Sequence, residues 1–167
     1  EQIFRVVLCS LKKRFIFLPH DENVKNIIDD FYTASQFPNV LGVIDGTHIL
    51  IVAPHEHPQV YVNRKKFHSI VLQGICTHKL QFLHAVAGWP GSVHDTRILC
   101  NSDIWNICPL WCGPNNHLLG DGAYPLRSWP LKPFKNNGHL TRIQRRFNYR
   151  LSSTRAAIER AFGLLKG

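Results

Sequence analysis

Apolar residues recur along the first part of the chain with a helical period. In residues 1–15 they stand three or four positions apart, and the same spacing returns between Val24 and Phe31, so two helices are expected. Asp21 stands where it can cap the second helix, and Pro38 ends it.

Three apolar runs then predict strands. The first surrounds Asp45, and its β-branched residues are typical of a strand buried on both faces. The second and third cover residues 70–77 and 80–87, and the turn at His78-Lys79 predicts that they form a hairpin. Residues 89–92 are expected to stop the third strand. We expect the hairpin to join the Asp45 strand in one sheet.

The second half of the chain alternates short elements with irregular segments. Asp95 is expected to open a short helix, whereas residues 108–116, with two prolines and a glycine, are expected to be irregular. Residues 117–119 predict a short buried strand that ends at Asp121. Prolines then exclude helix until a turn at residues 136–138. Two helices are expected at the end, over residues 141–151 and from a cap at Ser152 or Ser153, which gives an α/β or α+β plan.

The net positive charge of the chain favours a polyanionic partner. The chain has 167 residues, enough for one domain with a sizeable core, and 20 basic against 11 acidic residues give a net charge of +9. That balance suits nucleic acid, although a generally basic protein is the alternative. Arg64, Lys65 and Lys66 form one cluster that could contact a DNA backbone or simply make a solvated turn. A second cluster of arginines lies in the last quarter.

The cysteines and the hydropathy of the chain indicate the kind of cellular compartment to expect. Five cysteines without a CxxC pair indicate a reducing, intracellular compartment. A zinc site of Cys100, Cys108, Cys112 and His117 is a weaker alternative, because the spacing fits no common finger. No apolar run approaches the roughly 18 residues of a membrane span, and no signal peptide is visible. The chain starts and stops within patterned segments, so we expect a piece of a longer protein.

Four acidic residues stand at positions that suggest chemistry. Asp45 lies in a buried strand, Asp95 begins a helix, Asp121 lies between two glycines and Glu159 lies on the last helix. Carboxylates brought together in this way could hold Mg²⁺ or Mn²⁺ and support phosphodiester chemistry. Each residue also has a structural alternative: a hydrogen-bonded buried Asp, a helix cap, a turn residue, and an ion pair with Arg155 one turn earlier.

Five segments carry a specific resemblance. They are GVIDGTHI, YVNRKKFHS, GWPGSVHDTRIL, LLGDGAYPL and STRAAIERAFGLLK. In this order they resemble the nuclease domain of PIF/Harbinger transposases and the transposase-derived nuclease domesticated from them. The resemblance covers residues 38–167, so we expect a DDE nuclease domain there, preceded by a helical segment over residues 1–37.

The resemblance implies a fold and a site. The fold is α/β, of the RNase H-like (retroviral-integrase-like) type, with a mixed sheet and flanking helices. The catalytic residues are Asp45, Asp121 and Glu159, and the metal ligands are these three with Asp95. Mg²⁺ or Mn²⁺ is the expected cofactor.

The expected activity is that of a metal-dependent DNA endonuclease, a hydrolase that cleaves phosphodiester bonds by a two-metal mechanism. DNA is the expected partner, contacted by Arg64, Lys65, Lys66 and Arg155. The family also implies a separate Myb-like DNA-binding protein, a location in the nucleus or also the cytoplasm, and no membrane. The alternative is a catalytically inactive transposase-derived DNA-binding or adaptor protein.

Overall fold

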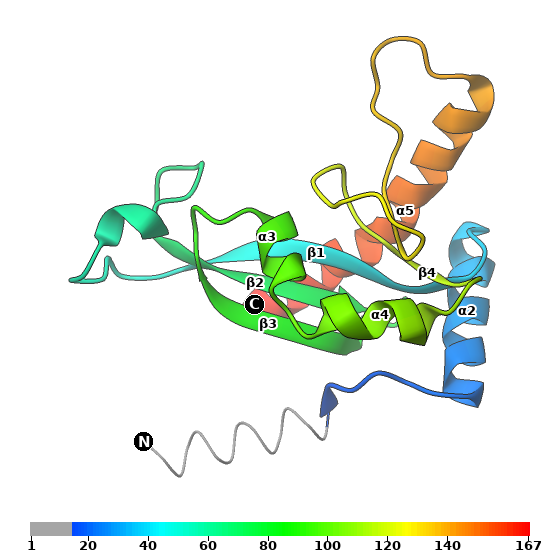
Figure 1. Ribbon diagram of the computed structural model, residues 1–167, viewed down its shortest axis with the longest axis horizontal. Coiled ribbons are helices and arrows are strands. Elements are labelled where there is room, and N and C mark those ends of the chain that lie inside the picture. Colours follow the sequence, from blue (N-terminus) through cyan, green and yellow to red (C-terminus); the bar gives the residue numbers. More distant parts are fainter. Residues whose placement is uncertain (1–14) are drawn as a thin grey trace.

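The computed structural model describes residues 15–167 (Figure 1). The helix predicted over residues 1–15 therefore lies outside the described residues, apart from its last position. The elements are α2 (Glu22–Ser35), β1 (Val40–Leu50), the 3-10 helix η1 (Pro58–Tyr61), β2 (Ser69–Cys76), β3 (Phe82–Pro90), α3 (Asp95–Cys100), α4 (Ile104–Cys112), β4 (His117–Leu119), β5 (Pro130–Leu131) and α5 (Arg142–Lys166).

The five strands form one mixed sheet in the order β3-β2-β1-β4-β5. β1 pairs antiparallel with β2, and β2 pairs antiparallel with β3, so the predicted hairpin and its place beside the Asp45 strand are confirmed. β4 pairs parallel with β1, and β5 pairs parallel with β4. The predicted mixed α/β architecture is confirmed.

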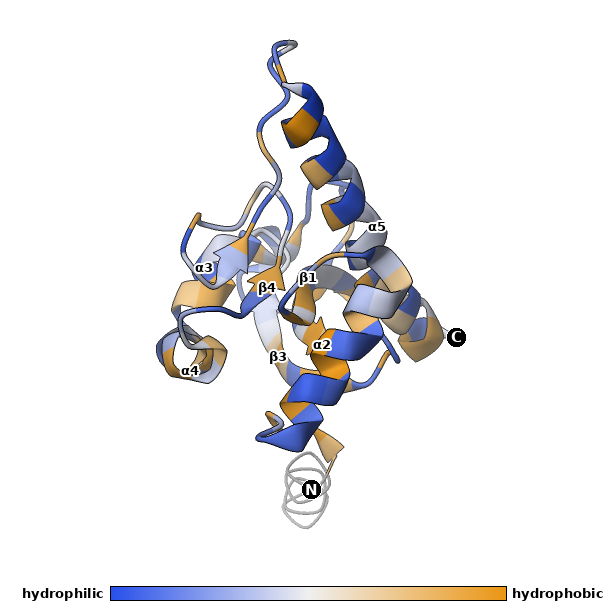
Figure 2. Cartoon of the chain, turned by 90° about the vertical axis from the view of Figure 1, so that its right-hand side faces the viewer, coloured by the Kyte–Doolittle hydropathy of each residue, from blue (hydrophilic) through white to orange (hydrophobic). Residues whose placement is uncertain are grey.

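Helices cover both faces of the sheet. Figure 2 shows α3 and α4 on one side and α5 on the other, with α2 beside the end of the sheet. Phe162 of α5 lies against Gly74 of β2 on its face. Ile44, Leu118 and Ile158 are fully buried between these layers, and each such side chain contributes about 1.5–3 kcal/mol through burial. The first half of β1, from Val40 to Ile44, is buried, whereas its second half is partly exposed.

Two local predictions about caps and ends are corrected. Asp21 is the residue before α2, but its side chain makes no capping hydrogen bond. β3 continues to Pro90 instead of stopping at residue 89, since Val71 and Ile70 still pair with Trp89 and Pro90. Proline is tolerated there because β3 is an edge strand and needs no further donor.

Two predictions about helices are also wrong. Residues 108–116 are not wholly irregular, because α4 runs to Cys112 and includes Pro109. Its buried residues Ile104, Cys108 and Cys112 lie one turn apart, and their packing outweighs the hydrogen bond lost at proline. The end of the chain forms one helix, not two: Ser152 and Ser153 are exposed positions within α5. No helix of the described residues is long and apolar enough to cross a membrane.

Candidate active site

Asp45 lies in the middle of β1 and points toward α5. One carboxylate oxygen, Oδ1, accepts a hydrogen bond from the Gly46 backbone N–H at 2.9 Å. The other, Oδ2, pairs with the Arg155 guanidinium at 2.7 Å, and the two side chains are 19% and 14% exposed. Burial raises the pKa of Asp45, and the charges of Asp121 and Glu159 add to this, while Arg155 and the Gly46 bond oppose it. The net result is a raised pKa.

Strand register brings Asp121 beside Asp45. β1 and β4 are parallel, and Val43 is opposite Leu119. Asp45 and Asp121 each lie two positions beyond that pair. The two residues therefore lie at the same height along the neighbouring chain segments. Asp121 is held there by its own turn, since its Oδ1 accepts a hydrogen bond from the Ala123 backbone N–H at 2.9 Å.

Glu159 and Arg155 both come from α5, one helical turn apart. The sequence suggested an ion pair between these two neighbours, but Arg155 pairs instead with Asp45, 110 residues away. Its Nε is buried and has no hydrogen-bond partner among the described residues. Contact of Arg155 with DNA stays a prediction; the structure places its charge inside the acidic cluster.

Asp95 approaches the cluster from the opposite face of the sheet. It is the first residue of α3, and His94 is the residue before the helix, so the capping role considered for Asp95 is not what the structure shows. A Cβ at Gly46 would collide with its Oδ1, so the glycine leaves room for this carboxylate. Burial, with the charges of Asp45 and Asp121, raises the pKa of Asp95 to about 6.

A small pocket of about 170 Å³ opens beside these carboxylates. Asp95 and Asp121 line it together with Arg64, His48 and His94. The Arg64 Nη2 lies 2.9 Å from the His94 Nδ1, so the guanidinium is held at the rim of the pocket. The exposed side chains of Lys65 and Lys66 follow Arg64 in the same turn. This turn is therefore positioned to present positive charge to a ligand at the carboxylates.

Two buried residues beneath the cluster were not anticipated. The Gln73 side-chain amide donates to the Tyr124 hydroxyl at 3.1 Å and to the Asp95 backbone carbonyl at 2.9 Å. Burial raises the pKa of Tyr124, and the charges of Asp95, Asp45 and Asp121 raise it further. Together these residues support the start of α3. The proximity of Tyr124 to Asp121 in the sequence was the one available signal.

The chemistry of the donor set fits a hard divalent cation. All four candidate ligands are carboxylates. Burial, and to a smaller degree the neighbouring carboxylates, raise the pKa of Asp45 and Asp95, and a cation would offset both effects. Within residues 15–167, however, no three His, Cys, Asp or Glu side chains meet as a ready metal-binding group. Arg155 pairs with one of the two carboxylate oxygens of Asp45, so it would compete with such an ion.

The other sequence candidates are not assembled into sites. Cys108 and Cys112 are buried on α4 while Cys100 is exposed, and these thiols form no metal-binding group with His117 in the described part of the chain. His55 and His57 lie on an exposed loop.

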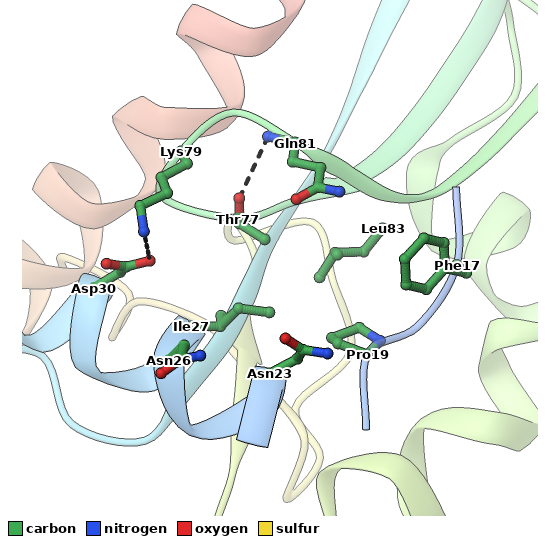
Figure 3. Close-up of a pocket in the computed structure, with 10 residues that line it drawn as sticks. All are labelled: Phe17, Pro19, Asn23, Asn26, Ile27, Asp30, Thr77, Lys79, Gln81 and Leu83. Atoms are coloured by element: carbon green, nitrogen blue, oxygen red, sulfur yellow. Dashed lines mark hydrogen bonds and ion pairs between the residues drawn. The ribbon is translucent and has the colours of Figure 1, made fainter. Parts of the chain in front are cut away.

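A separate pocket of about 280 Å³ lies between α2 and the β2–β3 turn (Figure 3). A 2.7 Å ion pair between Lys79 and Asp30 crosses it. Its charges already compensate each other, so it is not comparable with the acidic cluster.

Comparison with known proteins places these residues in a family. A family model described as a DDE superfamily endonuclease matches residues 44–167, a span that contains all four carboxylates. The chain belongs to the DDE superfamily of endonucleases.

Relatives of this DDE endonuclease domain occur in animals and plants. "Putative nuclease HARBI1" is 33% identical over 161 residues in Bos taurus and 32% identical in Homo sapiens, covering 95% of this chain and 45% of each relative. "Protein ALP1-like" of Arabidopsis thaliana is 30% identical over 174 residues, covering 94% of this chain and 42% of that protein. The chain thus spans less than half the length of these relatives. No solved structure matches it.

Proposed function

We propose that this domain is a metal-dependent DNA endonuclease of the Harbinger transposase type. The observation that carries the proposal is that Asp45 of β1 interacts electrostatically with Asp121, two residues after β4, and with Glu159 of α5. The match to the DDE superfamily and the nuclease named among the relatives support the same activity. DNA is the substrate that the net charge of +9 favours.

The four carboxylates have distinct places in this proposal. Asp45, Asp121 and Glu159 hold the cation or cations, and Asp95 completes the set. A bound Mg²⁺ or Mn²⁺ supplies activation of the attacking oxygen and stabilisation of the leaving oxygen.

Basic side chains then orient the substrate. Arg64, at the rim of the pocket lined by Asp95 and Asp121, binds a phosphate next to the cleaved bond. Lys65 and Lys66 add neighbouring phosphate contacts. Arg155 keeps Asp45 oriented through their ion pair, and a bound cation would compete with Arg155 for this carboxylate.

A second candidate function is a DNA-binding or adaptor protein without cleavage activity. Two observations favour it: the Arg155–Asp45 ion pair already neutralises the central carboxylate, and the described residues contain no ready group of three ligands. Under this alternative the cluster is permanently compensated by protein charges and takes up no divalent ion.

Cleavage and cation binding separate the two functions. The full-length protein is incubated with supercoiled plasmid and MgCl₂, beside Asp121→Asn and the control Asp29→Asn on the exposed side of α2. The nuclease proposal expects nicking by the wild type and the control, and none by Asp121→Asn. Calorimetric titration with MnCl₂ is the second readout. Absence of both nicking and cation binding in the folded wild type would establish the adaptor function instead.

A further inference from the structure

Nearly all of the excess positive charge of the chain lies in one continuous segment. Residues 122–158 contain eight Lys or Arg and no Asp or Glu, whereas the other 130 residues contain twelve basic and eleven acidic side chains. This segment leads from Asp121 to Glu159, so it begins and ends at the acidic cluster. A positive charge of this density, unbalanced over 37 residues, is a candidate polyanion-binding surface.

The middle of the charged segment projects from the body of the molecule. Figures 1 and 2 show the first turns of α5 and the loop before it extending beyond the sheet. The buried residues of α5 begin only at Leu151, and no position from Arg142 to Arg150 is buried. We call residues 132–150 the arm.

The arm is held in place by specific contacts. The Asn148 side chain makes two hydrogen bonds of 2.8 Å to the backbone of Phe134, which fasten the loop to the helix. The Phe147 ring packs edge-on against both Phe134 and Phe37. A capping box at Thr141 closes the start of α5. The arm is thus ordered before any ligand arrives, which lowers the cost of binding.

Its arginines share one free face. Arg142, Arg145 and Arg146 are exposed and recur at helical spacing with Tyr149, which is 75% exposed. Arg146 also lines a pocket together with Phe37 and Phe147, so this face borders the side of α5 that contacts the body. Among residues 15–167, no carboxylate forms an ion pair with these three guanidinium groups. Three unpaired arginines beside an exposed aromatic ring form a surface that can bind a phosphate backbone.

The helix sets the distance between the arm and the acidic cluster. Arg145 and Glu159 lie two heptads apart on nearly the same side of the uninterrupted helix α5. At 1.5 Å per residue this is about 21 Å, or roughly six phosphates along one strand of B-DNA.

We propose that the arm binds the backbone of duplex DNA roughly six nucleotides from the bond held at the carboxylates. The inference rests on the proposed function, since it takes the same DNA as the ligand. It adds a second contact region, separate from Arg64, Lys65 and Lys66, through which α5 connects substrate binding to the position of Glu159.

The test is a binding measurement in EDTA, where no cleavage takes place. Fluorescence anisotropy of a labelled duplex of about twenty base pairs is recorded across salt concentrations with the full-length protein. The triple variant Arg142→Gln, Arg145→Gln, Arg146→Gln should lower affinity on the order of tenfold or more and reduce the salt slope by about three. Gln has nearly the helix propensity of Arg, so α5 persists.

Three controls make the result specific. The corresponding triple lysine variant keeps the charge and should keep the slope. The pair Lys25→Gln, Lys79→Gln removes charge far from the arm and should change the slope little. Shortening the duplex to a hairpin stem of about five base pairs should abolish the difference between wild type and the glutamine variant, because that stem cannot reach both regions.

Each outcome of these measurements either supports or overturns the proposal. Unchanged affinity and slope in the glutamine variant, or an equal loss in the control pair, would overturn the proposal. Should the triple variant unfold, Arg145→Gln alone must still reduce the slope by about one. Tighter binding of an RNA duplex than of DNA would assign the arm to the other nucleic acid and refute the proposal. Failure of Mg²⁺-dependent nicking with intact arm binding would reject the nuclease function alone.

Discussion

Replacing Asp95 by Asn should stabilise the fold at neutral pH. Burial and the charges of Asp45 and Asp121 raise the pKa of Asp95 from 3.8 to about 6, a shift that corresponds to about 3 kcal/mol. Partial contact with water and the favourable position at the start of α3 reduce this, so we expect a gain of about 1–2 kcal/mol. Asn keeps the shape that fits against Gly46, so the substitution removes charge without creating a cavity.

The raised pKa of Asp95 also predicts how the stability of the wild type changes with pH. A raised pKa means that the fold favours the protonated acid, so the wild type is most favoured below pH 3.8 and loses this contribution as pH rises through about 6. Wild type and Asp95→Asn should therefore have equal stability near pH 3.5, diverge between pH 4 and 6, and differ by a constant amount above that. Urea unfolding at each pH measures this, with Asp29→Asn as the exposed control.

Added divalent cation should favour the wild type over Asp95→Asn in stability. If Asp95 is a ligand, MgCl₂ raises the urea midpoint of the wild type more than that of Asp95→Asn, because a bound ion stabilises the folded state by mass action. A variant less stable than the wild type at pH 7.5 in EDTA would refute the proposed repulsion and assign Asp95 a structural hydrogen-bonding role.

Three further predictions concern the residues that support the site and the arm. Gly46→Ala should destabilise by about 1–3 kcal/mol because its Cβ would meet the Asp95 carboxylate, and combining it with Asp95→Ala should recover most of the loss in the urea midpoint. Tyr124→Phe should cost about 1–2 kcal/mol in the same assay by leaving a buried donor of Gln73 unpaired, and an unchanged midpoint would contradict this. Thr141→Ala should cost about 1 kcal/mol and speed amide exchange in the first turn of α5, whereas Thr141→Ser should not.

Much of the fold was predictable because its signals are local. The β-branched run around Asp45 and the two-residue turn at His78-Lys79 determine β1 and the hairpin, and the structure confirms both. The errors arose at positions where tertiary packing overrides the local sequence signal. Pro109 suggested a break, but the buried face of α4 maintains the helix, and Ser152 suggested a cap within a helix that the core keeps continuous. β5, with two residues, has too little pattern to detect.

The family resemblance named the candidate site residues, but their electrostatic environment had no signal in the sequence. The register that places Asp121 level with Asp45 depends on a parallel pairing that no local signal announces. The pairing of Arg155 with Asp45 joins positions 110 residues apart, so sequence spacing favoured Glu159 instead. The support of Asp95 by Gln73 depends on tertiary contacts throughout.

The parallel pairing of β1 with β4 also determines when the acidic cluster can exist. The strands of the β1–β2–β3 meander pair with their neighbours in sequence, so this part can form early, whereas β4 must return across two helices before Leu119 meets Val43. Glu159 arrives later still, with the last helix. During synthesis all five strands therefore emerge from the ribosome before Glu159, and a chain interrupted before α5 has the strands of the sheet but lacks Glu159 and the helical part of the arm.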